Sequence, residues 1–447
     1  MNTKHAGLSF VVALVLTALL LASCGGGGAP AVPTGVVPEA TESPDQAGRP
    51  IPTPDEPLRI WGQHDLTNAE NPPSVLMNQR IADFEAATGI TVEYEQVAWD
   101  QLAPKLALAV TSGGDVPDLV EAGSQHIPSL LDAGALMPLD RLFPAADAPW
   151  IADMSYTDIV ACVYNGERVC ISNLVRSSIT YYRTADFPDG FPTTSEAWLA
   201  AAPELAANDQ FMSSFFANRE YAAVELTWAQ WIYSNGGQIF DAEGKPVWAN
   251  AQVVEVLEFG RDMFANDYLP EVILTGDFAA AEAPWIDGSA ASFRGGTWSV
   301  LFVPELDDQL DAGAVGIAGG LSFNGNDPSI FLVAENWVVP MGARNAGGAA
   351  LWIDQFMEPE LLAAWSAAQV GIPTRTAALE VGEFDDPFFV EASTLMAAQG
   401  RFMEQSPYYV ESLNALAIAI QEIMLDPSID IQEHLTEAQD DVLQRFW

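Results

Sequence analysis

Positive charge is scarce in this chain of 447 residues. Lysine and arginine together number 17 against 61 aspartates and glutamates, which leaves a formal net charge of −44. So acidic a surface repels phosphate backbones and anionic headgroups, so the composition excludes nucleic-acid binding. Because the acids are scattered along the chain rather than clustered, they favour a well-hydrated surface over capture of cationic ligands.

Cysteine is also rare, with three residues in the whole chain. Cys162 and Cys170 stand eight positions apart in CVYNGERVC and predict a disulfide that closes a hairpin, with its turn at Asn165-Gly166. A metal site is the alternative for these two thiols. The nearest histidines lie far away in the sequence, which weakens that alternative, and we expect no metal site and no cofactor.

Long apolar runs are absent except near the start, from Leu8 to Ser23. This segment follows Lys4 and has the pattern of a secretory signal. The residues LASC that end in Cys24 resemble a bacterial lipobox, which implies cleavage after residue 23 and lipid on Cys24. An ordinary signal peptide with an accidental cysteine is the alternative. No later run approaches the ~20 apolar residues that a transmembrane helix needs.

Residues 24–57 are rich in Gly, Pro, Ala and Thr and lack apolar periodicity, which predicts an unstructured tether. The body follows at residues 58–447, where strand-like and helix-like segments alternate. This order predicts an α/β fold of two lobes with parallel strand pairing. In the second part of the body we expect helices near residues 195–207, 222–235, 250–266, 346–369 and 411–425.

Catalytic signatures are missing. The chain contains no H-E-x-x-H, no G-x-S-x-G elbow and no phosphate-binding G-x-x-x-x-G-K-[ST] loop. These absences argue against an enzyme. A pair of carboxylates for glycoside hydrolysis stays open as an alternative, because the sequence does not show the distances between the acids.

Tryptophan is abundant, with 13 residues in the chain. Indole rings stack on the apolar faces of sugars, although most tryptophans in proteins belong to the core. The stretches RGGTW (294–298) and LTWAQWIYSNGG (226–237) place rings beside glycines in loops. Trp298 and Trp228 are therefore candidates for ligand contact.

Several ordered stretches resemble the carbohydrate-type extracellular solute-binding proteins of ABC importers, the maltose-binding-protein-like family. They include FEAATGITVEYEQVAWDQLAPKLALAVTSGGDVPDLVEAG, LLDAGALMPLD, YSNGGQIFDAEGKPVWAN, FRGGTW and GIPTR, and the similarity covers most of 58–447. The resemblance implies a two-lobed body that closes on its ligand like a hinge. It places lobe 1 at about 58–173 and 319–372, and lobe 2 at about 174–318 and 373–447.

The same resemblance implies the partners and the site. A monomer on the outer face of the cell membrane is expected to bind a small carbohydrate and to meet the permease subunits of its transporter. Sugar-contacting positions carry over to these residues: Glu121, Gln125, His126, Trp298, Tyr408 and Tyr409. Gln63, His64 and Asp65 are further candidates, because they follow the end of the first strand and α/β ligand sites lie at the carboxyl ends of strands.

Arg176 departs from the family, where the matching position looks acidic. A guanidinium there can bind a ligand carboxylate or phosphate, or it can pair with Glu121 or another acid of the chain. The ligand therefore remains either a neutral or an acidic solute. A lipid-anchored glycosidase, an adhesion protein or a sensor accessory on the same scaffold are the competing functions.

Overall fold

A computed structural model describes residues 50–144, 148–382 and 384–447. This part of the chain divides into two compact units. We call residues 50–175 and 333–386 the N-unit, and residues 176–332 and 387–447 the C-unit. The predicted signal peptide and Cys24 lie outside the described residues.

The chain passes between the units after Val175, Leu332 and Asp386. The family resemblance predicts these boundaries at about residues 173, 318 and 372 instead. The first two passages lie inside long strands, β6 (Ile171–Arg183) and β10 (Ile330–Val338), so each strand serves both units. A boundary inside a continuous strand leaves no turn residue to mark it in the sequence.

The N-unit is built on a mixed sheet. Strands β1 (Leu58–Gly62), β2 (Val92–Gln96) and β3 (Leu119–Gly123) are parallel, as predicted, and β10 runs antiparallel to β3. In strand order the sheet reads β2-β1-β3-β10-β6, and the short β11 (Ile372–Pro373) is added on β6. The carboxyl ends of β1 and β3 therefore lie at the same edge of the sheet.

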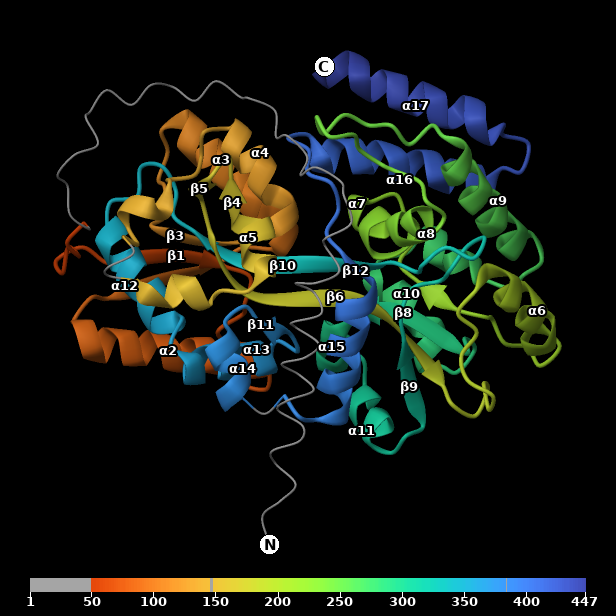
Figure 1. The fold of residues 1–447 in the computed structure, drawn as a ribbon, viewed down its shortest axis with the longest axis horizontal. Coiled ribbons are helices and arrows are strands. Elements are labelled where there is room, and N and C mark those ends of the chain that lie inside the picture. Colours follow the sequence, from red (N-terminus) through yellow and green to blue (C-terminus); the bar gives the residue numbers. More distant parts are fainter. Residues whose placement is uncertain (1–49, 145–147, 383) are drawn as a thin grey trace, which may run out of the picture. The chain divides into compact units, whose positions relative to one another are not determined.

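Helices connect these strands and cover the N-unit sheet (Figure 1). Two of them end where a glycine takes a left-handed conformation, Gly89 after α2 and Gly113 after α3, because glycine adopts positive φ without strain. The N-unit α-helices are α2 (Pro72–Thr88), α3 (Trp99–Ser112), α4 (Ile127–Asp132), α5 (Tyr156–Cys162), α12 (Ala346–Phe356), α13 (Pro359–Ala368) and α14 (Thr376–Val381). The expected helix 346–369 is thus two helices, with Pro359 at the start of the second.

The predicted disulfide hairpin is confirmed in the N-unit. Cys162 and Cys170 are bonded, with their Cα atoms 4.8 Å apart. Between them β4 (Val163–Tyr164) pairs with β5 (Glu167–Arg168). The turn residues Asn165 and Gly166 both have positive φ, of 52° and 85°, as a two-residue hairpin of this type requires.

The C-unit has its own group of paired strands around β6. Strand β8 (Ser292–Gly296) and strand β9 (Val315–Ala318) flank it, both antiparallel, and β7 (Ser214–Phe215) continues the sheet beyond β8. Strand β12 (Gly400–Arg401) pairs with the first residues of β10. This arrangement places Gly296, at the end of β8, opposite Ser178 of β6.

The C-unit helices agree with three of the expected segments closely. They are α6 (Ser195–Ala206), α7 (Tyr221–Ala223), α8 (Ala229–Ser234), α9 (Ala251–Ala265), α10 (Phe278–Ile286), α11 (Leu306–Asp311), α15 (Pro387–Gln399), α16 (Tyr409–Leu425) and α17 (Ile431–Phe446). The expected helix 222–235 contains a π-helical segment, η4 (Val224–Trp228), between α7 and α8. Helices α16 and α17 pack side by side (Figure 1).

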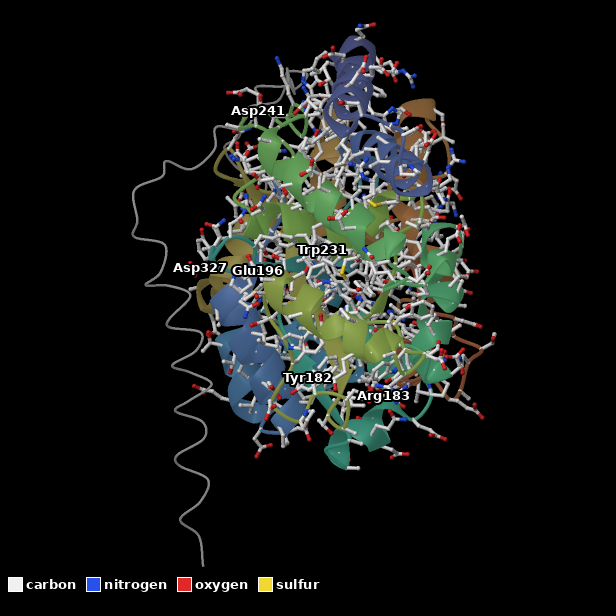
Figure 2. The ribbon with its side chains drawn as sticks, turned by 90° about the vertical axis from the view of Figure 1, so that its right-hand side faces the viewer. Tyr182, Arg183, Glu196, Trp231, Asp241 and Asp327 are labelled. Carbon is white, nitrogen blue, oxygen red and sulfur yellow. A yellow bond between two sulfur atoms is a disulfide. The ribbon has the colours of Figure 1, made fainter. Side chains whose placement is uncertain are left out.

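Aromatic rings form the core of the C-unit. Trp231, drawn inside the C-unit in Figure 2, contacts Trp228 and Phe215 edge-on, with ring centroids 5.3 Å apart in both pairs. It also meets Trp198 and Phe259. The acidic side chains of Glu196 and Asp327 are exposed instead. No helix in the described part of the chain is both long and apolar enough to span a membrane.

Candidate functional site

In the N-unit, the structure brings together three of the predicted residues where β1 and β3 end. The carboxylate of Glu121 accepts a hydrogen bond of 2.9 Å from the backbone N–H of Gln63. The other Glu121 oxygen lies 3.8 Å from Nε2 of His64. Both Glu121 and His64 are buried, whereas Gln63 is partly exposed. The shared sheet edge explains this grouping.

His64 is held from several sides. Its backbone N–H donates to the hydroxyl of Tyr94 at 3.0 Å, and its ring shares a 2.9 Å hydrogen bond with Gln369. The ring also meets Trp365 edge-on, at 5.1 Å between centroids. Burial, and secondarily the charge of Glu121, raises the pKa of Tyr94, so this hydroxyl stays protonated. His64 is therefore positioned by neighbours rather than free to rotate.

Tyr94 also explains a glycine at this place. A Cβ atom on Gly62 would lie 2.3 Å from the Tyr94 hydroxyl, so only glycine allows the ring to pass under the end of β1.

Gln125 and His126 lie in the short 3₁₀ helix η1 (Ser124–His126) that follows β3, and both are buried. Among the described residues, Oε1 of Gln125 has no hydrogen-bond partner. Burial lowers the pKa of His126 to about 4, although Asp100 opposes the shift, so His126 is neutral at pH 7. Asp65 is exposed and accepts hydrogen bonds from Thr67 in a local turn, which lowers its pKa.

In the C-unit, the structure places Arg176 beside Trp298. The guanidinium carbon lies 5.2 Å from the centroid of the indole ring, and both side chains are half-buried. Arg176 comes from β6, and Trp298 from η6 (Thr297–Leu301), the 3₁₀ turn after β8. The ring folds back over Gly296, where a Cβ atom would lie 2.3 Å from it. Gly296 therefore leaves the space that this orientation of the indole ring requires.

Beside Trp298 lies a small cavity that the sequence analysis missed. Its free volume is about 10 Å³, enough for one water-sized group. Ten C-unit residues line it: Phe216, Leu226, Phe278, Ala281, Glu282, Phe293, Arg294, Gly295, Trp298 and Ser299.

Arg294 of β8 is the one cation in this lining. Its Nε donates to the carbonyl of Leu226 at 3.0 Å, and its Nη1 to the hydroxyl of Thr180 at 3.1 Å. Burial lowers its pKa to about 9, so the group is still charged at pH 7. The signal in the sequence was an arginine inside the strand SFRGG, whose other residues are small or apolar.

The other three predicted residues of the C-unit pack among helices. Trp228 is completely buried against Phe215 and Trp231. Tyr409 is 2% exposed, and Tyr408 stacks on Phe446 with ring centroids 4.8 Å apart. An indole ring with no exposed surface presents no face to a solute, so we leave Trp228 out of the site that we propose below.

A buried carboxyl lies next to Tyr409. Glu225 is on the π-helical segment η4, and burial raises its pKa to about 8, although a hydrogen bond with Tyr409 opposes the shift. The carboxyl is therefore mostly protonated at neutral pH. π-helical segments are often found at functional sites, but Glu225 faces the core rather than solvent.

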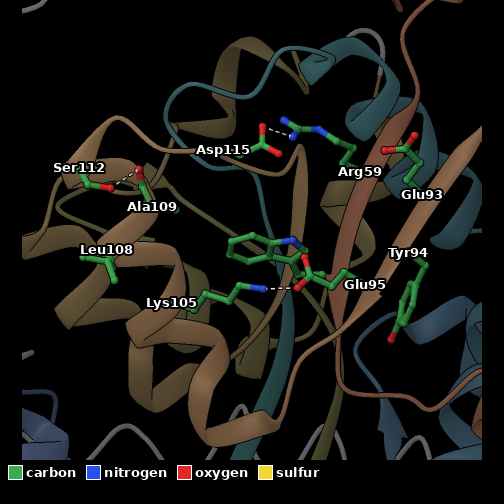
Figure 3. Close-up of a pocket in the computed structure, with 10 residues that line it drawn as sticks. Arg59, Glu93, Tyr94, Glu95, Lys105, Leu108, Ala109, Ser112 and Asp115 are labelled. Carbon is green, nitrogen blue, oxygen red and sulfur yellow. Dashed lines mark hydrogen bonds and ion pairs between the residues drawn. The ribbon is translucent and has the colours of Figure 1, made fainter.

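A separate open hollow of about 530 Å³ lies on the N-unit between β1, β2 and α3 (Figure 3). Lys105 lies over the ring of Trp61, 3.9 Å from its centroid, and pairs with Glu95. Arg59 pairs with Asp115 at the other end. None of the predicted ligand residues lines this hollow.

These groups include aromatic faces, amides, carboxylates and guanidinium groups, the kinds of group that orient a polar solute in protein binding sites. Among the described residues, no group of three or more His, Cys, Asp or Glu could hold a metal ion.

Two solved structures share the fold, and the chain covers nearly all of each. The GacH receptor of Streptomyces glaucescens GLA.O, solved unliganded and with acarbose, gives a TM-score of 0.73 at 15% identity, over 87% of this chain and 98% of that one. MalE3 of T. maritima with maltose bound gives 0.71 at 17% identity, over 87% and 99%. The two-lobed α/β fold expected from the sequence is confirmed.

A curated relative is 23% identical over 346 residues, which is 73% of this chain and 75% of its own length. It is the "Probable amino-acid ABC transporter periplasmic-binding protein y4oP" of Sinorhizobium fredii (strain NBRC 101917 / NGR234). The sequence pattern of the family described as "Bacterial extracellular solute-binding protein" matches residues 79–396, more than half of the chain. The family and these neighbours are binding proteins, not enzymes. The chain belongs to the bacterial extracellular solute-binding proteins.

Proposed function

We propose that this protein captures a saccharide outside the cytoplasm and delivers it to the permease of an ABC transporter. The observation that carries the proposal is the half-buried indole of Trp298, held over Gly296 beside Arg176. An indole face stacks on the apolar face of a sugar ring, while a neighbouring guanidinium donates to its oxygens.

Polar groups of the N-unit support the same proposal. Gln63, His64 and Glu121 lie together at the edge of the sheet where α/β proteins bind ligands, with a hydrogen bond from the Gln63 backbone to Glu121 and the His64 ring 3.8 Å from the same carboxylate. Oε1 of Gln125, which accepts no hydrogen bond from the residues that the structure describes, adds an acceptor. We propose that these residues bind the solute as well, so that a ligand's greater affinity for a closed state drives closure.

The names of the similar proteins point to two classes of solute. Two solved structures were determined with maltose or acarbose, whereas the curated relative is named for amino acids. Maltose and acarbose support a saccharide. The buried guanidinium of Arg294 beside Trp298 favours, as a second candidate, a solute that carries an acidic group.

The apolar segment and Cys24 near the start of the sequence support a proposal for the location. We propose that cleavage before Cys24 and lipid on its sulfur hold the protein, as a monomer, on the outer face of the cell membrane, and that residues 25–57 act as its tether. Near the end of this segment, the backbone N–H and C=O of Thr53 both form hydrogen bonds with the side-chain amide of Asn345 in the N-unit. The free part of the tether is therefore expected to end before Thr53.

A thermal-shift screen tests the saccharide. A ligand that binds only the folded state raises stability by about 2.7 kcal/mol at a hundredfold excess over Kd. We expect maltose, or another sugar in a broad panel, to raise Tm, and we expect Trp298→Ala to weaken its binding by roughly 1 to 3 kcal/mol.

The matched control is Trp150→Ala. Trp150 is also half-buried, but it lies in the N-unit, against Phe143 and Asp354. Loss of binding in both variants would indicate general damage to the fold. A panel of neutral and acidic sugars that leaves Tm unchanged contradicts the proposed function.

A further inference from the structure

The cavity beside Trp298 has a buried positive charge in its lining, that of Arg294. Arg294 is 4% exposed, and among the described residues it forms no ion pair. Its three hydrogen-bond acceptors are neutral: the carbonyls of Leu226 and Gly319 and the hydroxyl of Thr180. A buried ion that lacks an opposite charge raises the free energy of the folded protein. An anion that binds beside Arg294 would lower this free energy.

One nitrogen of the guanidinium remains available. Nη2 of Arg294 is shielded from solvent and has no hydrogen-bond partner in the described part of the chain. An N–H donor left in this state loses its hydrogen bond to water without replacing it. Because Arg294 lines the cavity, an oxygen placed there can satisfy this donor.

The size and the walls of the cavity define what enters. Its free volume of about 10 Å³ accepts one oxygen atom rather than a whole ring. Around it, Trp298 is half-buried and Phe278 is exposed, and Phe278 stacks on Phe216 with centroids 4.0 Å apart. The rest of the solute would therefore stay outside, against these aromatic faces.

Glu282 is the one carboxyl in the lining. Burial, followed by the charge of Asp277, raises its pKa, which favours the neutral carboxyl and reduces its repulsion toward an anion. A second positive charge, that of Arg176, lies nearby, with its guanidinium carbon 5.2 Å from the centroid of the Trp298 ring.

We propose that the cavity lined by Arg294 and Trp298 receives one oxygen of a carboxylate, so that the protein prefers an acidic solute. This inference rests on the proposed function and narrows its substrate class to sugars with a carboxylate, such as uronates. An amino acid carries the same group, so the experiment has to separate these two sources.

Isothermal titration with matched pairs of probes tests the preference. The probes are glucose with glucuronate, galactose with galacturonate, maltose, and the proteinogenic amino acids. We expect a uronate to bind about 10- to 100-fold more tightly than its parent sugar, the range that a hydrogen bond to a charged group provides. We expect Arg294→Lys to remove most of this ratio, because an ammonium group cannot reproduce the planar fork.

Two further variants keep the test decisive. Arg183→Lys is the matched control. Arg183 is an arginine of β6, which pairs with the β8 strand of Arg294, and its guanidinium lies 4.2 Å from the centroid of Trp285. It does not line the cavity. This variant should leave the ratio unchanged. Ala281→Val fills the cavity without altering the guanidinium. We expect it, like Arg294→Lys, to abolish the preference for a uronate over its parent sugar, so it tests the carboxylate site even if Arg294→Lys fails to fold.

The outcomes separate this inference from the proposed function. Equal binding of sugars and their uronates, or a preference that survives Ala281→Val, overturns the carboxylate site and leaves saccharide capture standing. Amino acids that bind with the same dependence on Arg294, while no sugar binds, keep the carboxylate site and overturn the saccharide. If no probe binds, both are wrong.

Discussion

The guanidinium carbon of Arg176 lies 5.2 Å from the centroid of the Trp298 ring, and the two side chains come from segments more than a hundred residues apart. Strand β6 supplies the arginine, and the turn after β8 supplies the tryptophan. The antiparallel register that pairs Ser178 with Gly296 brings these segments together. A cation beside an indole can serve a neutral or an acidic sugar, and a substitution separates the two.

Arg176→Ala should weaken binding of a uronate about tenfold or more while changing the affinity for maltose little, because a lost charge-assisted hydrogen bond matters most for a charged ligand. Isothermal titration with both ligands measures this difference. Arg261→Ala is the control. Arg261 is also an arginine of the C-unit, and its guanidinium donates a hydrogen bond to the backbone carbonyl of Ile429. Equal losses for both ligands would instead assign Arg176 the role of positioning Trp298.

Glu225 should make the protein less stable in alkaline solution. Its pKa rises from 4.5 to about 8 on folding, so the folded state binds the proton more tightly than the unfolded state. The stability associated with this group is complete below pH 4.5 and is lost as the pH rises to about 8, by an amount on the order of 5 kcal/mol.

Glu225→Gln removes this titration. We expect the difference in Tm between about pH 5 and about pH 9 to be smaller in the variant than in the original protein, as differential scanning calorimetry would show. Glu220→Gln, on an exposed residue nearby, should keep the original difference. If all three proteins show the same pH profile, Glu225 does not titrate in this range.

The disulfide should stabilise the N-unit. The chain-entropy relation assigns a loop of this length roughly 2.5 kcal/mol, so a double Cys162→Ala, Cys170→Ala variant is expected to unfold at lower urea concentration. Intact mass with and without reductant checks the bond itself. Two thiols that alkylate freely in the unreduced exported protein would show that the bond does not form.

Cys24 should hold the protein in the membrane fraction. In a bacterial host that processes lipoproteins, Cys24→Ala is expected to release the protein or leave its signal uncleaved, because the lipid supplies the membrane affinity. Cell fractionation and N-terminal mass analysis measure both effects. A wild-type protein that is fully soluble and begins at another residue contradicts the anchor.

Local sequence determined much of the fold. Gly89 and Gly113 end their helices through positive φ, and Asn165 and Gly166 form the hairpin turn that the disulfide spans. These features depend on backbone preferences of single residues, so neighbours along the chain suffice to predict them. The alternation of helices and strands likewise predicted the α/β class.

The different burial of two tryptophans is visible only in the tertiary structure. Trp228 and Trp298 both stand in segments near glycines, yet one is fully buried and the other is half-buried beside Arg176. Burial depends on which aromatic residues arrive from elsewhere, such as Phe215 and Trp231 for Trp228. No local pattern encodes that choice.

For the same reason, the sequence did not reveal Arg294 as a candidate site residue. Its acceptors belong to residues 68, 114 and 25 positions away, Leu226, Thr180 and Gly319. The pairing of β8 with β6 and the packing of η4 place these oxygens around one guanidinium. Within the described part of the chain, they leave its Nη2 without a hydrogen-bond partner. The helices and strands and their order along the chain were predictable from the sequence. Which charged group lies buried at the cavity depends on long-range packing, because burial depends on all the surrounding elements at once.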